Sequence, residues 1–118
     1  MSGFVAYPEQ FRVDDHKVRR YLLDPDHAEG GDKCAFLLSI GFTVDDPVSL
    51  MAALAAHPTP HTLTRTYPTP FGHRYHFEGP LPCPDGSVAN VRTVWQVDAD
   101  SGPNPARFIT LKPLPRSR

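Results

Sequence analysis

The spacing of apolar residues divides the chain into a helical first half and a second half of β-strands. Two of the helix ends are marked by strong signals: Asp46 precedes Pro47 at the start of one segment, and Gly41 ends another, which Asp32 is placed to cap. These signals, together with the periodicity, predict three helices, at residues 14–24, 33–40 and 45–57.

From residue 61 the apolar period changes to two, which is typical of half-buried strands. The pattern predicts four strands, at residues 61–67, 72–81, 87–98 and 107–114. Short connections favour an antiparallel meander. In the third strand one face is apolar, including Trp95, and the other is mixed, so helices are expected to cover one side only. The predicted fold is α+β: three N-terminal helices packed on one face of a four-stranded antiparallel sheet, in a single domain spanning residues 1–118.

The charge distribution limits the classes of function. The net charge is −1, but residues 1–59 carry five Lys/Arg against nine Asp/Glu, and residues 60–118 carry seven against four. This balance permits a local phosphate site and argues against a non-specific DNA coat. No apolar run is long enough to span a membrane and no signal peptide is recognisable, so we expect a cytoplasmic protein. The two cysteines form no Cys-x-x-Cys pair, and no metal or cofactor is predicted.

Polar residues are expected to gather on the uncovered face of the sheet. Folding the chain about the turn at residues 82–86 places Phe77 near Val91 and His76 beside Arg92. The same folding places Glu78 beside Asn90 and Arg74 near Val94, and the preceding turn adds Arg65 next to Arg74. A slip of one residue would exchange the two faces, so this grouping depends on the register.

This group has the residue types that RNA cleavage through the 2′-hydroxyl requires. His76 and Glu78 are the predicted catalytic proton-transfer groups, and Arg92 is predicted to meet the charge developing on phosphorus. Arg65 and Arg74 are expected to bind substrate phosphate, because a guanidinium matches phosphate oxygens. Lys33 is predicted as a further anion contact at a helix start, and the alternative for it is a solvated lysine. The alternative interpretation is that these residues are simply the polar side of an exposed sheet.

The sequence also resembles an uncharacterised bacterial, toxin-associated domain family. Its members read Lys-Leu-x-x-Tyr-Leu-Leu, Gly-x-Lys-Ala, Gly-x-Leu-x-x-Pro-x-Gly and Arg-x-Val-Thr. The matching positions are Lys17, Tyr21, Leu22, Leu23, Gly31, Lys33, Gly41, Phe42, Gly72, Gly79, Pro84, Gly86, Trp95, Arg107 and Thr110. The closing strand is similar to the last strand of ribonuclease toxins of the barnase, EndoU and RelE-like superfamily. Those toxins often end it with Ala-Tyr-Pro, where this chain has Leu111, Lys112 and Pro113.

The resemblance implies a ribonuclease-toxin fold and adds Arg107 and Thr110 to the predicted substrate contacts. The function predicted from residues and resemblance together is an RNA-directed, metal-independent nuclease. The alternative is a non-enzymatic immunity or regulatory module that binds a protein partner, a toxin or an inhibitor, and the acidic N-terminal half favours it. A third alternative is a homodimer formed through an exposed strand edge, without chemistry.

Overall fold

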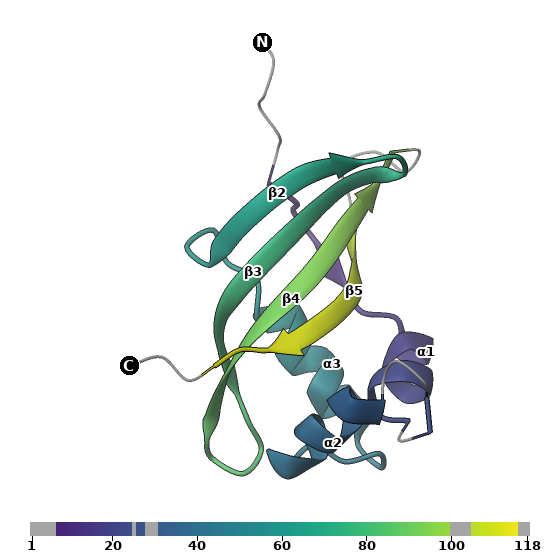
Figure 1. The fold of residues 1–118 in the computed structure, drawn as a ribbon, viewed down its shortest axis with the longest axis vertical. Helices are drawn as coiled ribbons and strands as arrows, with labels where there is room; N and C mark the ends of the chain where they lie inside the picture. Colours follow the sequence, from purple (N-terminus) through teal and green to yellow (C-terminus); the bar gives the residue numbers. More distant parts are fainter. Residues whose placement is uncertain (1–6, 25, 28–30, 100–104, 116–118) are drawn as a thin grey trace.

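The computed structural model describes residues 7–24, 26–27, 31–99 and 105–115, and consists of a twisted sheet with helices on one side (Figure 1). The strands are β1 (Phe11–Arg12), β2 (Leu63–Thr69), β3 (Gly72–Pro82), β4 (Val88–Asp98) and β5 (Ala106–Pro113). The helical segments are α1 (Asp15–Lys17), which continues as the π-helical η1 (Val18–Leu22), α2 (Gly31–Ser39) and α3 (Pro47–Ala56).

The sheet corrects the predicted fold. It has five strands in the order β1-β5-β4-β3-β2, and β1 runs parallel to β5, so the predicted four-stranded antiparallel sheet is wrong. The strand that was missed has only two residues, Phe11 and Arg12, too few for an alternating pattern to be visible in the sequence. The α+β class holds, and the long strands β2 to β5 do form an antiparallel meander.

The predicted register between β3 and β4 is also wrong, by two residues. Phe77 lies opposite Thr93 instead of Val91, and His76 lies opposite Val94 instead of Arg92. The ladder continues to the pair Pro82 and Val88, because the turn closes with hydrogen bonds from Cys83 N–H to Ser87 O (2.9 Å) and from Gly86 N–H to Cys83 O (3.0 Å). Since the error is an even number of residues, each side chain stays on the face predicted for it.

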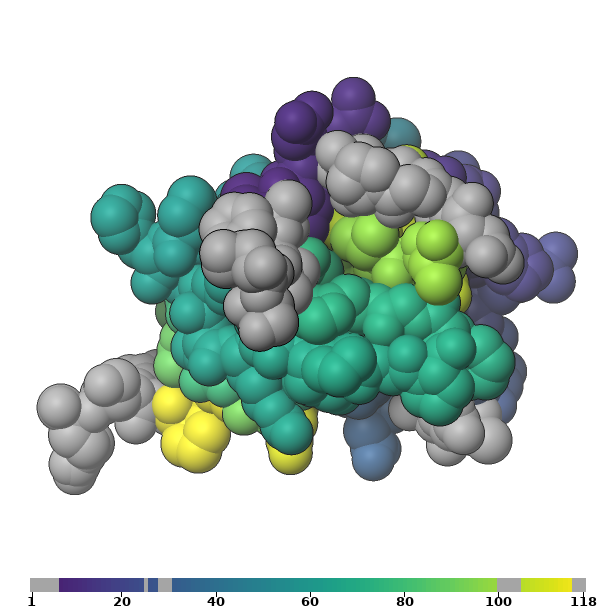
Figure 2. Space-filling model, turned by 90° about the horizontal axis from the view of Figure 1, so that it is seen from above, coloured from purple at the N-terminus to yellow at the C-terminus, as the bar shows by residue number. Residues whose placement is uncertain are grey.

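The remaining two pairs of the predicted group change in the same way. Glu78 lies opposite Arg92 instead of Asn90, and Arg74 lies opposite Gln96 instead of Val94. In the β2–β3 hairpin, Arg65 faces His76 instead of Arg74. Viewed from the end where β2 turns into β3, these two strands form the near surface and the end of β4 lies beside them (Figure 2).

The helix signals are mostly confirmed. The Asp46 carboxylate accepts a hydrogen bond from Ser49 N–H at 3.2 Å, Pro47 begins α3, and Gly41 follows α2 with a φ of +106°. A side chain at Gly41 would also meet the backbone of Asp85 at 2.8 Å. Asp32 does not cap α2, which begins one residue earlier, at Gly31. Within the described part of the chain, no helix is long and apolar enough to cross a membrane.

A buried polar network joins α3 to the sheet at the centre of the core. His57, directly after α3, is buried, and its Nδ1 lies 2.7 Å from Thr93 Oγ1 while its Nε2 lies 3.1 Å from Gly79 O. A carbonyl oxygen can only accept, so Nε2 carries the ring proton and Nδ1 accepts from the Thr93 hydroxyl. Trp95 Nε1–H donates to the same hydroxyl at 2.9 Å. Every polar atom of this buried group therefore has a partner.

Removing the shared hydroxyl should destabilise the fold. Thr93→Val leaves Trp95 Nε1–H and His57 Nδ1 without their partner in the core, which should lower the free energy of unfolding by about 1–3 kcal/mol. Urea unfolding of Thr66→Val, the same change at an exposed position of β2, is the control and should shift by less than about 0.5 kcal/mol. Equal effects of the two substitutions would contradict the role given to the network.

The same histidine should make stability depend on pH. Burial lowers the pKa of His57 below 6.5, its ordinary value, so below that pH the unfolded chain binds a proton that the folded protein resists. The contribution of His57 to the free energy of unfolding is thus present above pH 6.5 and is lost as the pH falls below that value. We expect the unfolding free energy to decrease on acidification, and to decrease less in His57→Gln. A variant with an undiminished pH dependence would show that other groups cause it.

Candidate functional site

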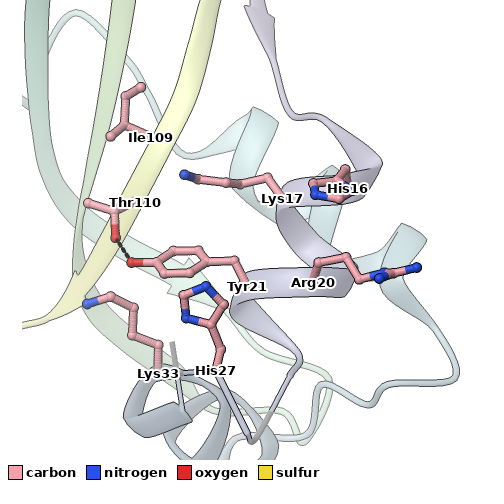
Figure 3. A pocket seen from close by; sticks show the side chains of 8 residues that line it. All are labelled: His16, Lys17, Arg20, Tyr21, His27, Lys33, Ile109 and Thr110. Carbon is pink, nitrogen blue, oxygen red and sulfur yellow. Dashed lines mark hydrogen bonds between the residues drawn. The ribbon is translucent and has the colours of Figure 1, made fainter. Parts of the chain in front are cut away.

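A cavity of about 570 Å³ opens between the first helical segment and the exposed edge of β5. Figure 3 shows its side chains, which come from four parts of the chain: α1 with η1, the short connection before α2, α2 itself, and β5. The lining residues are His16, Lys17, Arg20, Tyr21, His27, Lys33, Ile109 and Thr110. The cavity has the size of a small-molecule or nucleotide site.

Tyr21 lies at the centre of this cavity and is held there from three sides. Its hydroxyl lies 2.9 Å from the hydroxyl of Thr110, a residue 89 positions away in the chain. The Lys17 ammonium lies 4.7 Å from the Tyr21 ring centroid, and the His27 ring meets the same ring edge-on at 5.0 Å. Tyr21 is therefore fixed in position, with its hydroxyl directed at β5.

The two lysines reach the Tyr21–Thr110 pair from different helices. In Figure 3 the ammonium groups of Lys17 and Lys33 both point towards β5, on either side of the bond between Tyr21 and Thr110. Arg20 lies on the far side of Tyr21 from β5. Lys17, Tyr21, Lys33 and Thr110 are all half-buried, so their polar ends face the cavity with part of their hydration removed.

Local backbone structure explains how these side chains converge. Lys17 and Tyr21 are four residues apart, which brings them together on one side of the helical segment. The segment widens into the π-helical η1, where Leu23 N–H bonds to Val18 O at 2.8 Å, five residues back. Such widened turns often occur at functional sites. Lys33 is the third residue of α2, so the positive end of that helix adds to its charge.

The charge in the cavity is positive. Among the described residues that line it, three are cationic, two are histidines, and none carries a carboxylate. Within the described chain neither Lys33 nor Arg20 forms an ion pair. A concave, partly dehydrated site with this lining attracts an anion with several oxygen acceptors, such as a phosphate group.

On the open face of the sheet most of the predicted site residues lie together, but two of the arginines are paired with acids there. Arg92 forms an ion pair with Glu78 at 2.6 Å, and Arg107 forms one with Asp98 at 2.9 Å. Hydrogen bonds from Arg107 and from Gln96 lower the pKa of Asp98, which keeps this carboxylate charged. Each pair neutralises itself, so neither arginine is released for substrate without leaving an unpaired acid.

His76 has a different environment on the same face. Its Nε2 lies 3.2 Å from the Tyr67 hydroxyl, and the two rings meet at 5.4 Å. Burial lowers the pKa of His76, and the nearby charges of Arg92, Arg65 and Arg74 lower it further, while Glu78 opposes them. The imidazole is therefore neutral at physiological pH.

The structure thus divides the predicted site residues between two places. Lys33 and Thr110 line the cavity, whereas the six others lie outside it on β2, β3, β4 and β5: His76, Glu78, Arg92, Arg65, Arg74 and Arg107. Five further lining residues have no site role predicted from the sequence: Lys17, Tyr21, Arg20, His16 and His27. One signal was available: Lys17, Tyr21, Lys33 and Thr110 belong to three separate motifs of the resemblance, and all four meet in the cavity. No group of three or more potential metal ligands occurs among the described residues.

Comparison with known proteins gives a domain family, whose function is unknown, and a solved structure of similar fold. The chain belongs to a domain family of unknown function, DUF6883, whose model matches residues 6–115. No curated protein matches the chain. Among solved structures it is similar to a chain of a contact-dependent growth inhibition toxin–immunity protein complex from Klebsiella pneumoniae 342. The TM-score is 0.68 at 17% sequence identity, over 86% of this chain and 98% of that one. This likeness is one of fold.

The cavity should bind inorganic phosphate. Titration of the protein with phosphate, followed by NMR, is expected to shift the backbone amides of Lys17, Tyr21, Lys33 and Thr110 most, and Lys33→Met should weaken the binding by at least about tenfold, equivalent to one charge-assisted hydrogen bond. Lys112→Met, which removes an exposed lysine from β5, is the matched control and should bind as the wild type does. Shifts confined to the open sheet face would exclude the cavity as the anion site.

Proposed function

We propose that the protein is a metal-independent, RNA-directed nuclease whose active site is the cavity between η1 and β5. The observation that carries the proposal is the convergence of Lys17, Lys33, Tyr21 and Thr110 with His27 in one half-buried, positively charged cavity. This set supplies what phosphodiester cleavage requires: cations for the phosphate, and groups that accept and donate protons.

The expected reaction uses the 2′-hydroxyl of RNA as the nucleophile. His27 takes the proton of the 2′-hydroxyl while the 2′-oxygen bonds to phosphorus and the bond to the 5′-oxygen breaks. Tyr21 gives its phenolic proton to the departing 5′-oxygen, and the products are a 2′,3′-cyclic phosphate and a 5′-hydroxyl. Lys17 and Lys33 stabilise the charge on the non-bridging oxygens, and Thr110 positions the Tyr21 hydroxyl through their 2.9 Å bond.

The cavity supports this chemistry better than the centre that the sequence predicts at His76, Glu78 and Arg92. On the sheet face, Arg92 is already neutralised by Glu78 at 2.6 Å. Using Glu78 as a base would also compete with that ion pair, since protonating it leaves Arg92 without its partner. Lys33 has no such competitor within the described chain.

The family and the fold support a bacterial setting in which toxins and their inhibitors act in pairs. The similar solved structure is a toxin–immunity complex, and by analogy we propose that this protein has a protein partner that controls it. The proposed RNA substrate makes the cytoplasm its expected place of action.

The second candidate function is a non-enzymatic immunity or regulatory module. It is favoured by exposed apolar side chains on the helical side, next to acidic residues: Val44 is 50% exposed and Val48 66%, with Asp45 between them in sequence. A surface of this kind suits a partner protein with complementary charge.

RNA cleavage by purified variants separates these functions. With total RNA and a chelator present, the wild type should cleave, and Lys33→Met should lose activity by about 100-fold, as expected for loss of one transition-state donor. Tyr21→Phe should lose activity without losing phosphate binding, because it removes the proposed acid and keeps both lysines.

Lys112→Met and Arg92→Ala are the controls, and both should retain activity and fold. Activity lost in Arg92→Ala and kept in Lys33→Met would return the active site to the sheet face. Intact RNA with every protein, the wild type included, would remove the nuclease function in favour of the partner-binding module.

A further inference from the structure

A second positive cluster lies on the open face of the sheet, away from the cavity. Arg65 of β2 faces His76 of β3 directly, and Arg74 lies two residues before His76 on the same face of the same strand. We propose that Arg65, Arg74 and His76 form a second anion site, which holds another phosphate of the single-stranded RNA cleaved in the cavity. That the ligand is RNA rests on the proposed function. The second site adds that the RNA is a single strand of several nucleotides.

The cluster is held in place by neutral contacts. The Arg65 guanidinium lies 4.4 Å from the centroid of the Tyr67 ring, and the Tyr67 hydroxyl lies 3.2 Å from His76 Nε2. Arg74 donates two hydrogen bonds, of 3.2 and 2.5 Å, to the side-chain oxygen of Gln96. None of these partners removes positive charge, and within the described chain neither Arg65 nor Arg74 forms an ion pair.

The uncompensated charge distinguishes this cluster from its neighbours on the same face. Arg92 and Arg107 have carboxylate partners, at 2.6 and 2.9 Å, whereas among the described residues the partners of Arg65 and Arg74 are an aromatic ring and an amide. Arg92, Arg65 and Arg74 all lower the pKa of His76, and the charge of Glu78 opposes them. An anion bound between Arg65 and Arg74 would offset their positive charge, and so would weaken the effect by which they lower the pKa of His76.

The form of the surface favours a nucleic-acid strand over a compact anion. It is an open sheet face on which arginines alternate with an aromatic ring, the combination that binds single strands through phosphates and stacked bases. Three strand spacings of about 4.8 Å, or roughly 14 Å, separate β5 from β2 across the sheet. A few nucleotides can cover that span, and the edge of β5 opens towards the cavity, so one strand can contact both sites.

Salt-dependent binding of a short deoxyoligonucleotide tests this site. DNA lacks the 2′-hydroxyl and is not cleaved, so affinity is measured without turnover. Fluorescence anisotropy with a labelled oligothymidine gives the slope of the logarithm of the binding constant against the logarithm of the salt concentration. This slope should be smaller in magnitude by about 1.4 in Arg65→Gln/Arg74→Gln than in the wild type, because two single-strand phosphate contacts are lost. Glutamine keeps much of each aliphatic stem and removes only the charge.

Arg12→Gln/Arg19→Gln is the control, since it removes the same charge from two exposed ion pairs, one in β1 and one in η1, that lie outside the proposed cluster. Its salt slope should equal that of the wild type. Oligonucleotide binding should also raise the pKa of His76, followed by NMR, and this rise should vanish in Arg65→Gln/Arg74→Gln.

Equal slopes for the wild type and Arg65→Gln/Arg74→Gln would overturn the second site. Binding that is lost only in Lys33→Met would do the same and confine the strand to the cavity. A protein that binds the oligonucleotide through Arg65 and Arg74 but cleaves no RNA would keep this site and remove the proposed nuclease function, so the two failures are distinguishable.

Discussion

The position of Phe11 determines where the rest of the N-terminal half lies. Its ring packs edge-on against Phe77 at 5.6 Å and Trp95 at 5.2 Å, and Trp95 continues the contact to Phe108 at 5.3 Å. Aromatic pairs of this kind contribute about 0.5–1.5 kcal/mol each beyond the area they bury. The cluster holds β1 parallel to β5, and the chain then passes directly into α1 and η1. Tyr21 can reach Thr110 only because the chain enters the helices at this edge of the sheet.

The distribution of paired and unpaired cations gives the molecule its two candidate surfaces. On the sheet, Glu78 and Asp98 neutralise Arg92 and Arg107, and these pairs stabilise the face without creating a site. Within the described part of the chain, cations without a carboxylate partner include Lys33 and Arg20 in the cavity, and Arg65 and Arg74 on β2 and β3. An RNA strand is the kind of ligand whose regularly spaced phosphates can meet both places at once.

Local signals in the sequence predicted those parts of the fold that local interactions determine. The Asp46 cap, the Gly41 stop and the alternation that puts Trp95 in the core all follow from residues close together in the chain. The strand β1 could not be predicted in this way, because two residues pair only when a distant strand is already present. The register error at residues 82–86 arose because the exact length of a turn is a property of its hydrogen bonds, and composition does not specify it.

The cavity was out of reach of the sequence for a related reason. Its central contact joins Tyr21 and Thr110, which are 89 positions apart, and its lysines come from two helices whose relative position depends on the core. Of the residues that line the cavity, the sequence predicts a site role only for Lys33 and Thr110, and it groups them with arginines that lie elsewhere in the structure. The family motifs contained the missing residues Lys17 and Tyr21, but nothing in their spacing indicates that they meet.

A crystal structure of the protein with a dinucleotide whose 2′-hydroxyl is replaced by hydrogen would show directly whether the cavity binds the phosphate of RNA. We predict that the phosphate lies between the ammonium groups of Lys17 and Lys33, with its 5′-oxygen within hydrogen-bonding distance of the Tyr21 hydroxyl. A phosphate bound at Arg92 and Glu78 instead, with the cavity empty, would exclude the cavity as the active site.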